Sequence, residues 1–137
     1  MVTKSRTLAL FYALVAMVFG VFYREFPKFS GFTGQTNLSG MHPHYFILGI
    51  FFFLILALLE KSFGFSAHKR TGGVVLAYNI GLNISGLGFL VRGLAPVWGT
   101  ELSTGMDASI SGVAGIGPII LGVCIGLLLL RVRRTAQ

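Results

Sequence analysis

The sequence is poor in charge, and poorer still in acids. Of its 137 residues only 11% are charged, and four Asp and Glu stand against 11 Lys and Arg. Soluble domains carry roughly 25% charged residues, so this scarcity excludes an ordinary water-soluble fold. The 54% of hydrophobic residues fall in continuous runs rather than on one face of each helix, as expected for helices in lipid. The chain is therefore predicted to be an integral membrane protein.

Other scarce residue types exclude whole classes of chemistry. The single cysteine, Cys124, has no partner for an internal disulfide. The sequence shows no Ser/His/Asp set, no phosphate-binding loop and no paired carboxylates, so independent catalytic activity is not expected. The formal charge of +7 sits at the ends of apolar runs, which is typical of a topology signal and not of a nucleic-acid-binding surface.

Four apolar runs define the predicted fold. They indicate one all-α domain over residues 1–137, a four-helix bundle with spans at about 7–24, 43–60, 72–92 and 109–130. Each run is long enough to cross about 30 Å at roughly 1.5 Å per residue. The first run resembles a signal peptide, but the bulky and charged residues after it, Phe22 to Phe26, do not suit a cleavage site.

The basic residues predict an orientation. One side of the membrane receives three, Arg24, Lys28 and Arg92, and the other receives eight: Lys4, Arg6, Lys61, Lys69, Arg70, Arg131, Arg133 and Arg134. Because cytoplasmic loops carry the excess of Lys and Arg, both termini are predicted to be cytoplasmic, in a plasma membrane. The segments Gly20 to Arg24 and Gly88 to Arg92 also match, which suggests two helical hairpins related by parallel duplication.

Two histidines, in His42-Pro43-His44, stand out as candidate ligands at the outer start of the second span. Ionisable side chains at membrane depth are functional candidates, and histidine binds haem and transition metals. Residues two apart on a regular helix point in nearly opposite directions. The two imidazoles are therefore expected to face different partners unless the backbone is irregular. The alternative is that each histidine is bonded to a loop carbonyl.

Charged residues gather near the same outer end. Arg24, Arg92 and Asp107 could hold the propionates of a haem or bind another anion, because guanidinium pairs with carboxylates in a bidentate manner. In the alternative interpretation, the arginines reach the lipid headgroups and Asp107 only begins the fourth helix.

Polar and small residues mark the later spans. Asn79 and Asn83 lie one turn apart in the third span, where they either bond to a neighbouring helix or line a polar pathway. The many glycines predict close helix contacts, with Gly122-x-x-x-Gly126 as the recognisable small-residue pattern. They include Gly81, Gly86, Gly88, Gly112, Gly115, Gly117, Gly122 and Gly126.

Several short motifs carry a family resemblance. They are Phe22-Tyr-Arg-Glu-Phe26, the His42-to-Gly49 stretch, Tyr78-Asn-Ile-Gly-Leu82, Val91-Arg-Gly93 and Asp107-Ala-x-Ile-Ser-Gly112. Together they resemble a bacterial family of small four-span membrane proteins of unknown function. The His-x-His stretch also looks like helices of the haem-copper oxidase and nitric oxide reductase group. The first resemblance implies a histidine where this chain has Pro118. A haem here would therefore need another axial ligand, such as His42, Met41 or Met106, or would be five-coordinate, or would be absent.

Three functions remain open from the sequence. The first is a protein that binds haem b or a transition metal, with His44 as the favoured ligand and His42 as the second candidate. Arg24 and Arg92 would be its anion partners, and its role would be redox, sensing or accessory. The second is a small oligomeric transporter or channel using Asn79 and Asn83. The third is a structural subunit of a membrane complex. The expected partners are the lipid bilayer and either further copies or another membrane protein.

Overall fold

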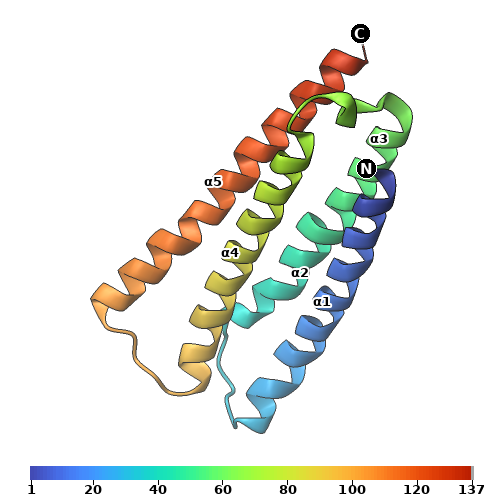
Figure 1. Cartoon of the computed structure of the whole chain (residues 1–137). Coiled ribbons are helices and arrows are strands. Elements are labelled where there is room, and N and C mark those ends of the chain that lie inside the picture. Colours follow the sequence, from blue (N-terminus) through green and yellow to red (C-terminus); the bar gives the residue numbers. More distant parts are fainter. Residues whose placement is uncertain (137) are drawn as a thin grey trace.

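The protein is an all-α bundle of four long helical segments. The computed structural model describes residues 1–136 and contains α1 (Val2–Phe29), a continuous helical segment over Asn37–Phe63, α4 (Thr71–Val97) and α5 (Thr104–Thr135) (Figure 1). All four are long and apolar enough to cross a membrane. The predicted all-α fold with four candidate spans is confirmed, and it is compatible with a multi-pass membrane protein.

The helices extend past the apolar runs that predicted them. Helix α1 begins at Val2 and continues through Arg24 to Phe29. The second segment begins at Asn37, six residues before Pro43, with Thr36 as its cap. Pro43 therefore lies inside this helical segment, in its first α-helical turn (Met41–His44), and not at its start. Hydropathy identifies only the part of a helix that suits hydrocarbon, and it misses polar turns at either end.

The second segment changes its helical type along its length. A short 3₁₀ turn (Asn37–Gly40) leads into α2 (Met41–His44), a π-helix (Tyr45–Phe51) and then α3 (Phe52–Phe63). Within the π-helix, a Cβ built at Gly49 would lie 2.6 Å from the Cβ of Tyr12, so the backbone approaches α1 closely there. The Leu48 carbonyl accepts a hydrogen bond from the Tyr78 hydroxyl at 2.8 Å. Helical irregularities of this type are frequent near functional sites.

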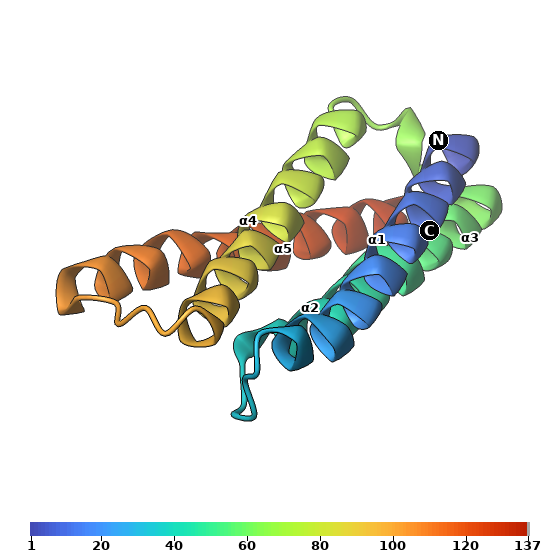
Figure 2. The same cartoon turned by 90° about the horizontal axis from the view of Figure 1, so that it is seen from below.

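Two hairpins make up the bundle. Helix α1 packs along α2 and α3, and α4 packs along α5, whose first half leans away from α1, α2 and α3 (Figures 1 and 2). The 3₁₀ turn, α2 and the π-helix connect the hairpins by packing against α4. The parallel duplication of the hairpins stays a prediction.

Aromatic rings fill the centre of the first hairpin. Phe19, Tyr45, Tyr12 and Phe53 form a column of nearly parallel rings, with successive centroids 5.7, 5.8 and 5.7 Å apart and interplanar angles of 10°, 14° and 4°. Tyr12, Tyr45 and Phe53 are buried, so this column forms much of the core between α1 and its neighbours.

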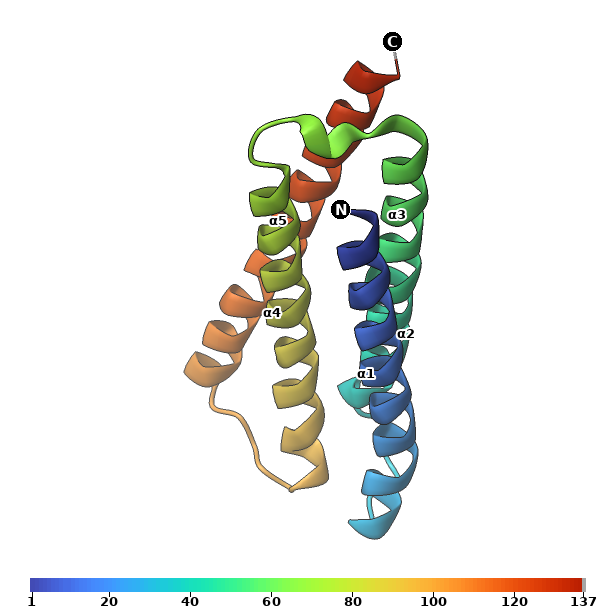
Figure 3. The same cartoon turned by 45° about the vertical axis from the view of Figure 1, so that its right-hand side comes forward.

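The first turn of α1 and the last turn of α5 lie at one end of the bundle, together with the connection between α3 and α4 (Figures 1 and 3). We call this the basic end, because it carries the eight basic residues assigned above to one side. Glu60, the acid at this end, accepts hydrogen bonds from Ser66 through both carboxylate oxygens, one from the backbone N–H at 2.9 Å and one from the hydroxyl. Glu60 thereby fixes the turn after α3.

Candidate functional site

His42 faces α1. Its Nδ1 lies 2.8 Å from the backbone carbonyl oxygen of Ala16, one turn before Gly20. A Cβ built at Gly20 would lie 3.0 Å from the same Nδ1, so the absence of a side chain there lets the ring approach α1. Because a carbonyl oxygen only accepts hydrogen bonds, Nδ1 must carry the proton, and Nε2 keeps its lone pair.

His44 faces the opposite neighbour, α4. Its Nε2 lies 3.1 Å from the carbonyl oxygen of Leu82, and its ring packs edge-on against Tyr45 and Phe89. The same reasoning places the proton on Nε2 and the lone pair on Nδ1, the nitrogen closer to its own backbone. The two histidines therefore have different partners, as expected for residues two apart. The π-helix begins only after His44 and does not turn them toward each other.

Arg24 lies one turn beyond Gly20 on α1. With Gly20, Tyr23, Pro27, Gly34 and Thr36 it lines a groove of about 480 Å³ between α1 and the following loop. Arg24 is exposed and lies 3.4 Å from Glu25, measured from Nε to Oε1. Such an exposed pair is weak, so the guanidinium is free to take another anion.

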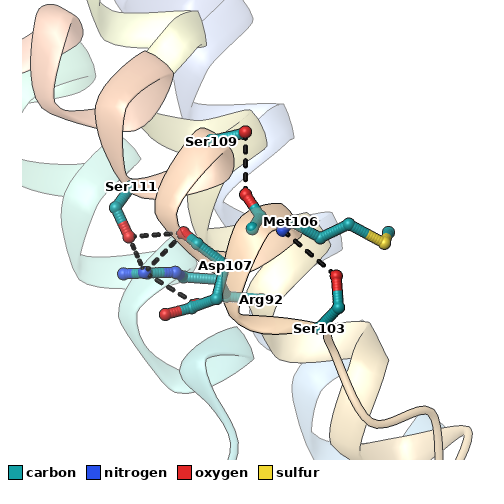
Figure 4. A network of polar contacts seen from close by, with 7 residues as sticks. Arg92, Ser103, Met106, Asp107, Ser109 and Ser111 are labelled. Carbon is teal, nitrogen blue, oxygen red and sulfur yellow. Dashed lines mark hydrogen bonds and ion pairs between the residues drawn. The ribbon is translucent and has the colours of Figure 1, made fainter.

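Arg92 is held by α5 instead. Its Nη2 lies 3.0 Å from Oδ1 of Asp107 and also donates to the hydroxyl of Ser111 (Figure 4). Arg92 and Asp107 thus join α4 to the first turns of α5. The structure does not bring Arg92 into the groove of Arg24.

Asn79 and Asn83 bond across to the first hairpin. The Tyr12 hydroxyl donates to Oδ1 of Asn79 at 2.8 Å and accepts from Nδ2 of Asn83 at 2.9 Å, and the Tyr45 hydroxyl donates to Oδ1 of Asn83 at 3.3 Å. The Nδ2 atoms of both asparagines also donate to carbonyls one turn earlier, those of Val75 and Asn79. The amides therefore act as interhelical contacts, and each amide oxygen and nitrogen has at least one hydrogen-bond partner. A polar pathway along them stays a prediction.

Sequence reasoning missed the tyrosines and the anchor of the loop. Tyr12 and Tyr45 sit in apolar runs, where nothing local distinguishes them from other aromatic residues. Thr36 is buried and donates its hydroxyl to the Gly93 carbonyl of α4, which fixes the loop that precedes the histidines. Of the other candidate axial ligands, Met41 is fully buried and Met106 is exposed in the first turn of α5.

The side chains near this end of the bundle suit a haem better than a metal ion held by protein ligands alone. The described residues contain no cluster of three or more His, Cys, Asp or Glu side chains able to hold a metal ion. A protein-only site for a transition metal usually needs at least three such ligands. Haem iron needs only one or two, because the porphyrin supplies four nitrogens.

One comparison identifies relatives of the chain. The family described as "Protein of unknown function (DUF2871)" matches residues 2–135. Neither the curated proteins nor the solved structures give a match. The resemblance to an uncharacterised family is thus confirmed, whereas the likeness of the His-x-His stretch to haem-copper oxidase helices finds no support.

Proposed function

The chain belongs to the DUF2871 family, and we propose that it binds a haem at the end of the bundle remote from the basic end, in a redox, sensing or accessory role. The observation that carries this proposal is the contact between His42 and α1. A histidine that ligates a metal commonly donates its other ring N–H to a backbone carbonyl, which fixes the tautomer and the ring orientation. His42 does this through Nδ1 at 2.8 Å and keeps Nε2 as a ligand atom.

His42 supports this role better than His44, although the sequence favoured His44. The Nε2 of His44, the ring nitrogen farther from its own backbone, is bonded to the Leu82 carbonyl, so ligation through it would leave that carbonyl without this donor. Ligation by His42 breaks no hydrogen bond.

Arg24 supplies the proposed anion partner. It lies two turns beyond Ala16, the residue whose carbonyl holds His42, and residues four apart share a helix face. A guanidinium in that position suits a haem propionate. Arg92 is less suited to this role, because Asp107 and Ser111 already occupy it.

The orientation completes the proposal. With the basic end in the cytoplasm of a plasma membrane, as the excess of Lys and Arg predicts, both termini are cytoplasmic and the haem lies toward the outer leaflet. A haem there can exchange electrons or a small ligand with the outer face.

An absorption spectrum tests the haem proposal. The full chain, expressed with haem precursors and purified in mild detergent, is expected to show a Soret band with stoichiometric haem. His42→Ala is expected to lose at least about tenfold in haem occupancy, since iron loses its protein ligand. His44→Ala is expected to keep most of the band, because its imidazole contacts Leu82 and is not the ligand.

His68→Ala is the matched control, since His68 lies at the basic end, where its Nε2 is 3.2 Å from the Thr135 hydroxyl. It is expected to bind haem like wild type. A wild-type protein with no Soret band refutes haem binding. A band lost in His44→Ala but kept in His42→Ala refutes the assignment of the ligand, and circular dichroism verifies that each variant is folded.

A further inference from the structure

A second groove lies at the basic end, between α1 and α3. Its volume is about 360 Å³. It is lined by Val2 and Arg6 of α1 and by Leu54, Ala57, Leu58 and Lys61 of α3. It therefore combines two cations with an apolar wall.

The two cations of this groove have no anion within the described protein. Arg6 and Lys61 are exposed, and neither takes part in an ion pair or side-chain hydrogen bond among residues 1–136. The acid next to Lys61 in sequence, Glu60, is buried and bonded through both oxygens to Ser66. The groove therefore carries a local positive charge that an external anion can neutralise.

The apolar wall continues away from the cations into the span. Leu54, Leu58 and Lys61 lie at positions i, i+4 and i+7, which share one face of a helix. Leu54 lies seven residues before Lys61, so it sits about 10 Å deeper along α3. Both leucines are exposed. A ligand that matches this pattern has a negative head at Lys61 and an alkyl chain alongside Leu58 and Leu54.

We propose that this groove is a binding site for a phospholipid with a net negative headgroup. Its phosphate lies between Arg6 and Lys61, and one acyl chain runs along the leucines. Arg6 lies one turn after Val2, the first residue of α1. Its long side chain reaches the headgroup level by extending along the apolar surface. Free phosphate matches the cations but leaves the apolar wall uncovered. The proposal does not depend on haem binding.

Competition between lipids tests the site. The delipidated full chain in detergent is incubated with equal amounts of phosphatidylglycerol and phosphatidylcholine of the same acyl length, and bound lipid is counted by native mass spectrometry. Wild type is expected to prefer the anionic lipid by about tenfold or more, given the attraction contributed by each nearby cation. The double variant Arg6→Gln/Lys61→Gln is expected to retain at most about a twofold preference.

The matched control is Lys4→Gln/Lys69→Gln, which removes the same charge from two exposed residues at the same end but outside the groove. It is expected to keep the wild-type preference. Equal loss in both double variants overturns the site in favour of a general surface attraction. Competition by the deacylated headgroup as strong as that by the intact lipid overturns the role of the apolar wall, and a wild type with no preference overturns the proposal outright.

Discussion

Gly117→Val is expected to lower the free energy of unfolding by about 3 kcal/mol, the upper part of the range for overpacking a tight contact. Gly117 lies at a close approach of α5 to α4. A Cβ built there would meet the Ser85 hydroxyl and would lie 2.8 Å from the Gly81 carbonyl oxygen. These neighbours include backbone, which cannot rotate away as a flexible side chain can. The two helices must therefore separate, and α5 has few contacts with elements other than α4 to hold it in place.

Gly122→Val is the matched control for this effect. It makes the same substitution in the same helix, but a Cβ at Gly122 meets nothing within 4 Å among the described residues. We expect a change within about 0.5 kcal/mol, as is usual for exposed positions. Unfolding in a denaturing detergent, followed by circular dichroism, measures both variants. Equal stability of the two would show that the Gly81 and Gly117 contact does not hold the second hairpin together.

The same glycines show where sequence reasoning about packing ends. The spacing of Gly122 and Gly126 predicts a close helix contact, yet neither has a neighbour within 4 Å of a built Cβ in the described chain, so that prediction is wrong within one chain. The contact is made instead by Gly81 and Gly117, two other glycines for which the sequence predicted close helix packing. A small-residue motif on one helix indicates that another helix can approach closely there. Which glycine makes the contact depends on where the two helices cross, and one helix alone does not specify this.

The four spans were predictable for a different reason. The thickness of a bilayer sets the length of the apolar run that a spanning helix needs, and a backbone in lipid must satisfy its own hydrogen bonds. The helix ends were not predictable to the same degree. Thr36 begins the second segment through contacts with Leu38 and with Gly93, and the second of these residues is 57 positions away in sequence.

The contacts of the histidines were predictable only in part. Helical geometry predicted that His42 and His44 face different partners, and they do. It could not predict which carbonyl each ring meets, because Ala16 and Leu82 are placed by the packing of α1 and α4. The carbonyl that each ring contacts determines which ring nitrogen carries the proton. For this reason the proposed ligand changes from His44 to His42.

Tyr12→Ala is expected to be the other severe change, with a loss of about 3–5 kcal/mol, as found when large aromatic residues are removed from a core. The Tyr12 ring is 2% exposed and stacks between Tyr45 and Phe53. Truncation leaves a cavity in the aromatic column and removes a hydrogen-bond partner from each asparagine of α4. Both losses fall at the contact between the two hairpins, so they act on the same interface.

Two variants separate the ring from its hydroxyl and from general effects in α1. Tyr12→Phe keeps the ring and removes the hydrogen bonds, so it is expected to cost about 1–2 kcal/mol, in the range for interhelical hydrogen bonds in membranes. Phe11→Ala removes a neighbouring aromatic ring that is 53% exposed and is expected to cost less than 1 kcal/mol in detergent. If Tyr12→Phe were as unstable as Tyr12→Ala, the hydroxyl network with Asn79 and Asn83 would hold the hairpins together, and the stacked column would contribute little. If Phe11→Ala matched Tyr12→Ala, the loss would reflect α1 as a whole and not the column at its centre.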